Sequence, residues 1–149
     1  MKLKIATMIV ICSIALATIG CKKEKIKGCK ISYATNYKST AEEDDGSCLY
    51  ESKIIFWQNQ ANAASWSGAG VTALTFYVDN QLIGSCAASV YNASAPSCSS
   101  SGAASVVKSL GSSKSKSFSY SIKDQTGYVW YNGSVDFDGS VSCTTQQFN

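Results

Sequence analysis

The sequence predicts an all-β protein: a small disulfide-stapled β-sandwich preceded by a short acidic loop that two cysteines bracket. Three observations predict this fold class. From residue 53 onward, short segments of alternating apolar and polar residues are separated by turn-forming pairs. That region has no long stretch with the 3.6-residue period of a helix. Cysteines flank the acidic loop and recur at wide spacing after it, as in small exported proteins with few other means of building a core.

Residues 1–20 have the pattern of a secretory signal. Two lysines precede an uncharged apolar run over residues 5–19, and small residues follow. The run is shorter than the roughly 20 residues that span a bilayer, so a permanent transmembrane helix is the less favoured interpretation.

Residues 18–21, Thr-Ile-Gly-Cys, resemble a bacterial lipobox, in which a peptidase cuts before a cysteine that carries a thioether-linked diacylglycerol. Thr18 stands where leucine is usual, as in the looser lipoboxes of Bacteroidota lipoproteins. The resemblance implies that Cys21 is the lipid attachment site and that residues 21–27 form a charged tether. Each buried methylene contributes about 0.8 kcal/mol, so two or three acyl chains anchor a protein permanently. The alternative is a simple secretory signal followed by an unmodified cysteine.

The cysteines predict two disulfides. Two of the seven belong to the leader and the lipid site, and five remain. In an oxidising compartment Cys29 and Cys48 are expected to pair, which stabilises the fold by about 3 kcal/mol on the chain-entropy model. Cys98 with Cys143 is the favoured second pair and leaves Cys86 as a free thiol. Pairing of Cys86 with Cys98 is the alternative.

The acidic module, residues 28–51, contains four consecutive acids between its two cysteines. It resembles a short repeat of secreted and adhesive Bacteroidota proteins, although Ile31 and Ser32 replace the usual Asp and Pro. The matching positions are Gly28, Cys29, Ala34, Asn36, Tyr37, Ala41, Asp44, Asp45, Gly46, Ser47, Cys48 and Tyr50.

Calcium takes about six to eight oxygen ligands, and the module offers Asn36, Glu43, Asp44 and Asp45 as candidates. The register excludes an EF-hand, because taking Gly46 as the sixth loop position puts alanine where the first aspartate must stand. Asp-Asp-Gly-Ser is also an ordinary turn sequence. We therefore expect chiefly a cross-linked spacer without a cofactor, with calcium binding as the alternative.

Residues 52–149 are expected to form the sandwich. The pairs at residues 79–80, 132–133 and 138–139, Asp-Asn, Asn-Gly and Asp-Gly, are expected to form hairpin turns. Residues 87–116 are rich in Ser and Ala and are expected to be a long loop that either contains an edge strand or has no ordered element. The candidate strands are Ile54–Gln58, Thr72–Val78, Gln81–Cys86, Ser105–Leu110, Ser117–Ile122, Tyr128–Tyr131, Ser134–Phe137 and Ser140–Gln147.

The run FYVDNQLIGSC, with the later FSYSIKD and GYVWYNGSV, resembles small β-sandwich modules of Bacteroidota lipoproteins that are similar in pattern to transthyretin-like or carboxypeptidase-regulatory-like domains. The resemblance implies a structural or binding unit in the outer membrane, on its surface or its periplasmic face. It supplies no catalytic residues.

Two sets of residues in the sandwich are candidates for binding. Asp136 and Asp138 are either cation ligands or solvent-facing neighbours of buried residues. Four aromatic residues are either a platform for a sugar ring or, as is more typical of alternating aromatics, part of the core. These are Trp57, Trp66, Tyr128 and Trp130.

Composition excludes several function classes. Histidine is absent, which excludes Ser-His-Asp and Cys-His hydrolases and histidine-based metal sites. All 13 basic residues are lysine, and without arginine or a basic stripe nucleic-acid binding is not expected. Few acids follow residue 52, so an enzyme is not expected. The predicted function is a lipid-anchored envelope module that binds a glycan or another envelope protein. The alternative is a calcium-dependent carbohydrate-binding or carboxylate-based hydrolytic module at the cell surface.

Overall fold

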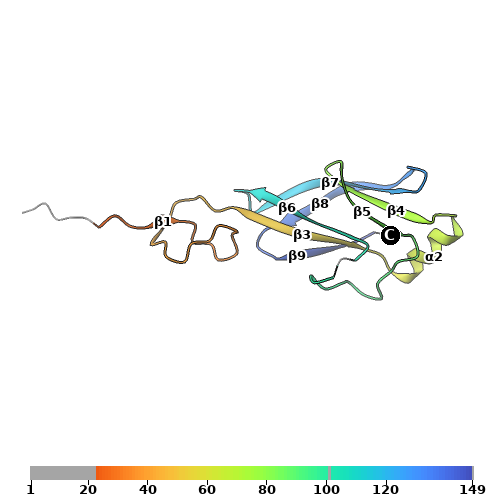
Figure 1. The fold of residues 1–149 in the computed structure, drawn as a ribbon, viewed down its shortest axis with the longest axis horizontal. Helices are drawn as coiled ribbons and strands as arrows, with labels where there is room; N and C mark the ends of the chain where they lie inside the picture. The colour runs from red at the N-terminus through yellow and green to blue at the C-terminus, as the bar shows by residue number, and fades with distance from the viewer. Residues whose placement is uncertain (1–22, 101, 149) are drawn as a thin grey trace, which may run out of the picture.

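The computed structural model describes residues 23–100 and 102–148 and confirms the all-β, disulfide-stapled fold (Figure 1). The predicted leader and the lipid site at Cys21 lie outside the described residues. The elements are β1 (Lys27–Gly28), β2 (Glu43–Asp44), β3 (Tyr50–Trp57), α2 (Gln60–Gly68), β4 (Ala73–Val78), β5 (Gln81–Ala87), β6 (Ala104–Gly111), β7 (Ser115–Asp124), β8 (Val129–Asp138) and β9 (Cys143–Gln147). A three-stranded sheet in the order β6-β3-β9 packs against a four-stranded sheet in the order β5-β4-β7-β8.

Alternate residues of the strands form the core between the two sheets. On β4, Leu74, Phe76 and Val78 are at most 1% exposed, and on β7 Ile122 is fully buried. Their neighbours along each strand are more exposed. The period of two that the sequence shows in these segments is therefore the period of burial.

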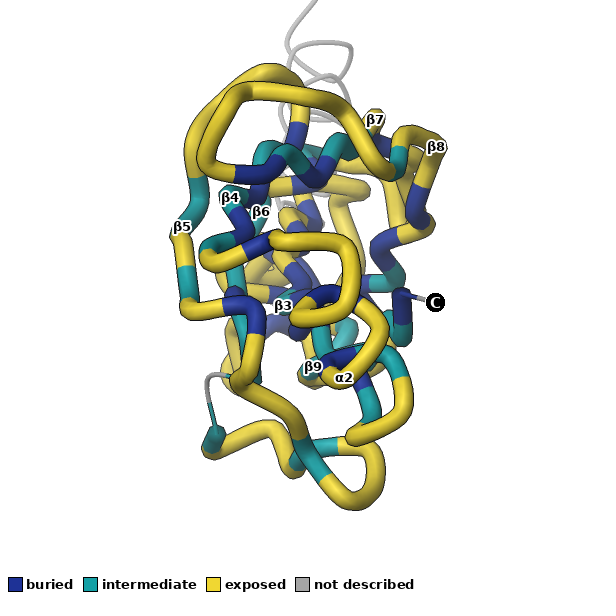
Figure 2. The backbone as a smooth tube through the Cα atoms, turned by 90° about the vertical axis from the view of Figure 1, so that its right-hand side faces the viewer, coloured by how far each residue is buried: buried dark blue, intermediate teal, exposed yellow. Residues whose placement is uncertain are grey.

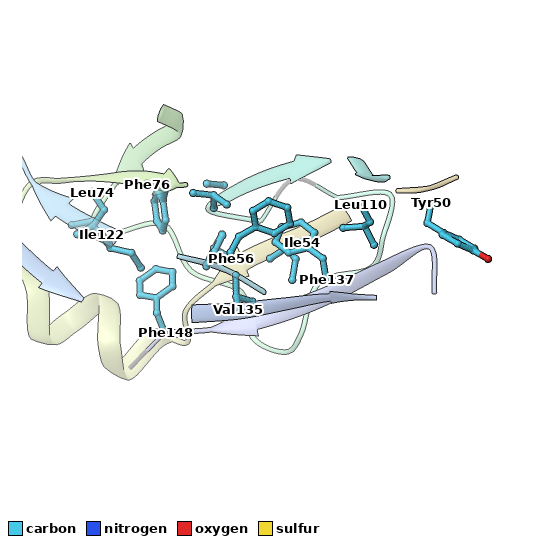
Figure 3. Close-up of a cluster of buried hydrophobic side chains, with 14 of the residues drawn as sticks. Tyr50, Ile54, Phe56, Leu74, Phe76, Leu110, Ile122, Val135, Phe137 and Phe148 are labelled. Carbon is cyan, nitrogen blue, oxygen red and sulfur yellow. The ribbon is translucent and has the colours of Figure 1, made fainter. Parts of the chain in front are cut away.

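Strand β3 is the middle strand of the smaller sheet and carries the centre of the core. It pairs antiparallel with β6 and parallel with β9. Ile54 and Phe56 are at most 1% exposed, and the Phe56 ring lies 5.9 Å from that of Phe76 on the opposite sheet. Figure 3 shows these side chains within a core that extends from Leu74 and Ile122 at one end to Tyr50 at the other. Burial of each such side chain contributes about 1.5–3 kcal/mol.

The turn at Asp79-Asn80 is confirmed. Both residues have left-handed backbones, with φ of 52° and 60°, as a two-residue hairpin of the tight, strand-matched type needs. Val78 pairs directly with Gln81 across it.

The turn at Asn132-Gly133 was predicted wrongly, because the two strands expected on either side of it are one continuous strand, β8. Gly133 pairs with Tyr120 of β7 in the middle of the sheet. A Cβ at Gly133 would lie 3.1 Å from the Tyr120 ring, so this glycine admits the ring and does not bend the chain.

The Asp138-Gly139 pair ends β8 but does not form a hairpin. The chain crosses there to the other sheet, where β9 begins at Cys143 and adds to β3. Residues 140–142, which were expected to be strand, belong to this crossing.

Helix α2 was not predicted. Only Ala63 and Trp66 are buried in its nine residues, so its apolar period is too short to stand out. It begins at the N-cap Asn59, whose side chain accepts a hydrogen bond from the Asn62 backbone N–H at 2.9 Å. Among the described residues, no helix has the length and hydrophobicity that crossing a bilayer requires.

Both predicted disulfides are confirmed, Cys29–Cys48 in the acidic module and Cys98–Cys143 in the sandwich. The second joins the loop before β6 to the first residue of β9. Cys86 is the free thiol, as expected, and burial raises its pKa to about 11. Its thiolate, the reactive form, is therefore scarce at neutral pH.

A buried glutamine joins α2 to the sandwich. Gln58, which follows β3, is fully buried. Its Nε2 donates to the carbonyls of Ala88 at 2.8 Å and Val90 at 2.7 Å, and its Oε1 accepts from the Trp66 indole at 2.5 Å. One side chain thus satisfies three polar groups, of which the indole N–H and the Ala88 carbonyl are buried.

We expect Gln58→Leu to lower the free energy of unfolding by about 2–4 kcal/mol, because it leaves an indole N–H and two carbonyls without partners. Ser52→Ala is the matched control. Its hydroxyl is buried but has no hydrogen-bond partner, so this change should cost less than about 1 kcal/mol. Urea denaturation measures both values, and equal losses in the two variants would contradict the role of Gln58.

Candidate functional site

The candidate site is a shallow pocket of about 300 Å³ at the α2 end of the sandwich, called the aromatic pocket below. Figure 2 views this end directly and shows largely exposed residues around α2. The Trp66 and Trp130 rings meet edge to face, with centroids 5.1 Å apart, and Tyr131 lies 5.9 Å from Trp66. The pocket is lined by Asn62, Ser65, Trp66, Ala69, Trp130 and Tyr131.

The structure brings together three of the four aromatic residues that the sequence offered as platform or core. Trp66 is buried at 5% exposure, whereas Trp130 is 38% and Tyr128 is 63% exposed. The Tyr128 ring lies 5.3 Å from Trp130 and extends the aromatic surface beyond the pocket. Trp57 is on β3, outside the pocket. The set is therefore partly core and partly exposed surface.

Helix α2 places Trp66 in the floor of the pocket. Its indole N–H is used by Gln58 inside the protein, so only the hydrocarbon part of the ring can face a ligand. The helix is also tied to the end of the chain, because Asn62 Nδ2 donates to the Phe148 carbonyl at 2.8 Å. Asn62 and Ser65 were not foreseen as site residues, because the helix itself was not.

An aspartate fixes the exposed tryptophan. Trp130 Nε1 donates to Asp124 Oδ2 at 2.9 Å. Asp124 Oδ1 accepts from the backbone N–H and the hydroxyl of Thr126, at 2.8 and 2.6 Å, and from the Tyr128 backbone N–H at 3.1 Å. The hydrogen bond from the Thr126 hydroxyl, with those from Trp130 and the backbone, lowers the pKa of Asp124 to about 2 against the opposing effect of burial.

The aromatic pocket has a neutral lining. Among the described residues, none with a formal charge lines it. Its polar lining residues include Asn62, Ser65 and Tyr131, and burial and the neighbouring Tyr120 raise the pKa of the Tyr131 hydroxyl. Such a surface can hold a neutral ligand with an apolar face and a polar edge.

Asp136 and Asp138, the other candidates in the sandwich, lie on β8 and face solvent beside the buried Val135 and Phe137, as the simpler interpretation has it. Asp136 accepts a hydrogen bond from the Ser117 hydroxyl. Asp138 Oδ1 accepts from the backbone N–H of Ser140 at 2.8 Å, which lowers the pKa of Asp138. Each carboxylate thus has a local structural partner.

Asn36 clamps the acidic module. Its Nδ2 donates to the Ser47 carbonyl at 2.6 Å, and its Oδ1 accepts from the Leu49 backbone N–H at 2.8 Å. Both ends of the amide therefore hold the segment on either side of Cys48. This side chain, which the sequence offered as a candidate calcium ligand, has a structural role in the module.

The acids of the module make turns and a surface ion pair. Asp44 and Asp45 each accept from the backbone N–H two residues ahead at 3.0 Å, and the Ser47 hydroxyl and N–H lower the pKa of Asp45. Glu43 Oε2 lies 3.9 Å from Lys25 Nζ. Within residues 23–100 and 102–148, no three acidic, cysteine or histidine side chains gather as a metal site does. Calcium binding stays a prediction.

A second pocket, of about 500 Å³, lies where the acidic module meets the sandwich. Tyr33 and Thr35 of the module line it together with Ser52 and Lys53 of β3 and residues 139–142. The Lys53 ammonium already donates to the carbonyls of Cys98 at 3.0 Å and Ser100 at 3.2 Å. This pocket is larger than the aromatic pocket, but its lining does not indicate a ligand class.

Comparisons with protein-family models, with curated proteins and with solved structures found no match, so the site is interpreted from its own chemistry.

We expect the charged form of Asp124 to stabilise the fold. Its native pKa of about 2 lies below the value of about 3.9 for an unfolded chain, so the contribution is complete above about pH 4 and is lost as the pH falls through about 2. Urea denaturation measures the free energy of unfolding at each pH. Between about pH 4 and pH 2 it should fall less in Asp124→Asn than in the wild type. In Thr126→Val, which removes one donor to Asp124, the decrease should be intermediate. Equal acid dependence in all three proteins would contradict this account.

We expect Cys29→Ala with Cys48→Ala to release the acidic module while the sandwich stays folded. Within residues 28–49 the buried hydrophobic residues are small, namely the two cysteines with Ala34 and Ala41, so loop closure worth about 3 kcal/mol is a large share of the stability of this segment. Hydrogen exchange should become faster in residues 28–49 and stay slow in β4 and β7. Cys86→Ala is the control and should leave hydrogen exchange unchanged in both regions. Unchanged protection of residues 28–49 in the double variant would contradict the prediction.

Proposed function

We propose that this protein is a lipid-anchored component of the bacterial cell envelope whose sandwich is a non-catalytic binding module, with the aromatic pocket as its binding site. One observation carries the proposal. The described chain begins at the β1 end, and the pocket lies with α2 at the opposite end of an elongated molecule (Figure 1).

The order of the segments supports anchoring through the N-terminus. Residues 23–27 are exposed, and the backbone carbonyl of Ile26 accepts from the N–H groups of Glu42 and Glu43, which joins this segment to the acidic module. Acyl groups on Cys21 would put the membrane next to the module and turn the pocket away from it. The two ends would then have separate tasks, and the module would act as a spacer.

The contents of the pocket support binding without catalysis. A general acid, a base or a nucleophile has to lie within about 3 Å of the reacting atoms. The described lining residues are aromatic, amide, hydroxyl and methyl groups, and the nearby Asp124 carboxylate is already saturated by hydrogen bonds.

The envelope location rests on the leader and the lipobox resemblance, which point to the outer membrane. The proposal holds for either face of that membrane, because in both cases the pocket projects into the adjoining space. Its partners are then the lipid bilayer, through the anchor, and a glycan or another envelope protein, through the pocket.

We expect Cys21→Ser to abolish acylation. In a Gram-negative host fed a labelled fatty acid, the wild-type chain should carry label and sediment with membranes until detergent is added. The variant should carry no label, because the thioether to the diacylglycerol forms on the Cys21 sulfur.

Cys86→Ser is the matched control, since it removes a cysteine that is neither in a disulfide nor in the leader, and it should keep the label. Mass spectrometry of the wild-type protein gives the decisive reading. An unmodified cysteine at position 21, or a fatty-acid label that survives in Cys21→Ser, would refute the anchoring.

A further inference from the structure

We infer that the aromatic pocket binds one sugar ring of a neutral glycan, an inference that rests on the proposed role of this pocket as the binding site. The observation behind it is a pair of tryptophans held rigidly at an open, uncharged surface.

The pocket offers aromatic surface at low entropic cost. Both indole N–H groups are committed to protein acceptors, Trp66 to Gln58 and Trp130 to Asp124. The rings are therefore set before any ligand arrives, and binding does not have to order them. The face of an aromatic ring is electron-rich and attracts the weakly positive C–H groups that cover one side of a pyranose.

The shape of the pocket selects a ligand that stays half in water. Sites for apolar small molecules enclose most of the ligand surface. Here the pocket is shallow, at about 300 Å³, and Trp130 and Tyr128 remain exposed at its edge. A pyranose suits this surface, because it has an apolar face to place on the rings and hydroxyls that remain hydrated or meet the polar edge.

The polar edge matches hydroxyl groups. The Ser65 hydroxyl donates to the Ala61 carbonyl at 3.2 Å, and its oxygen still has lone pairs that accept from a ligand hydroxyl. The Tyr131 hydroxyl is protonated at neutral pH, as an ordinary phenol is, and burial raises its pKa further. Both residues line the pocket beside the tryptophans and offer polar partners to a sugar ring stacked there.

The charge of the pocket excludes anionic ligands. Phosphate, sulfate and uronate groups are bound through lysine, arginine or clusters of backbone N–H groups. No lysine is among the described lining residues. The ionised group that holds Trp130 is the Asp124 carboxylate, which is negative. A neutral sugar therefore fits better than a nucleotide or an acidic polysaccharide.

A protein partner fits less well. A stable protein interface covers about 800 Å² on each side, with a large aromatic or aliphatic anchor in a fitted cavity. The aromatic pocket is a shallow depression at one end of the molecule, with Tyr128 beside Trp130 at its edge. The competing hypothesis is that a second copy of the protein covers this end, and the test below distinguishes that case.

The test is titration of the full chain, in micelles of a detergent without a sugar headgroup, with cellotetraose, xylotetraose, mannotetraose and maltotetraose up to millimolar concentration. Tryptophan fluorescence and calorimetry report binding. At least one neutral tetrasaccharide should bind saturably, and tetragalacturonate should not. Trp130→Ala should weaken binding about tenfold or more, as loss of a central aromatic contact does.

Trp130→Phe keeps a ring and should retain part of the affinity, which guards against a folding defect in the alanine variant. Trp57→Phe removes a tryptophan outside the pocket and should leave the affinity unchanged. Four results would overturn the inference: no saturable binding of any neutral sugar, affinity that is unchanged in Trp130→Ala, equal affinity for tetragalacturonate, or sedimentation showing a dimer that Trp130→Ala dissociates. Acylation of Cys21 is measured separately, so failure of the sugar leaves the anchoring intact and failure of the anchoring leaves the sugar intact.

Discussion

The burial of the inward face of strand β3, the middle strand of the smaller sheet, is the constraint on which the rest of the structure depends. Ile54 and Phe56 point inward at almost zero exposure, with β6 on one side of the strand and β9 on the other. A slip of one residue would turn both out of the core, so the register of the smaller sheet is set by this strand. Cys143, the first residue of β9, lies opposite Lys53 of β3 in the sheet. Its disulfide with Cys98 helps to hold β9 in that register. The acidic module precedes β3 in the chain, and Gln58 follows it directly. Strand β3 therefore positions both ends of the molecule.

The two tryptophans of the pocket show how polar groups can position an apolar surface. Gln58 is completely buried and holds Trp66, while Asp124 stands at the end of β7 and holds Trp130 from the neighbouring strand. Buried polar side chains are costly unless all their atoms are paired, and here nearly every one is. The same arrangement leaves hydrocarbon edges and faces toward solvent. An exposed indole without such support would lose side-chain entropy on binding, whereas these rings have already lost it on folding.

The sequence predicted the strands wherever alternation and a short turn coincided, as in β4, β5 and β7, and it predicted both disulfides because the number and spacing of the cysteines left few pairings. It failed where the signal was ambiguous. Asn132-Gly133 has the composition of a turn, but the glycine is there because the Tyr120 ring needs the space. Helix α2 buries too few residues for its period to be visible. The aromatic pocket could be foreseen as a list of residue types, but its assembly depends on α2 and on a contact between residues 66 and 130, and such long-range proximity leaves no mark on either local segment.

A shallow neutral pocket binds a single sugar ring weakly, because only one face of the ring leaves water and few hydrogen bonds are made. On the proposed anchor this weakness is not a defect. Many copies in one membrane would present their pockets outward on an elongated body, and a polymeric glycan offers many equivalent rings. Binding of the second pocket is then intramolecular, with an effective concentration of about millimolar when the spacing permits it, so the strength of attachment grows with the number of copies and not with the quality of one site. Rigidity is needed in the pocket, where it lowers the entropic cost of each contact, and separation from the membrane is needed at the other end, where the acidic module lies. The elongated arrangement of module, sandwich and pocket supplies both.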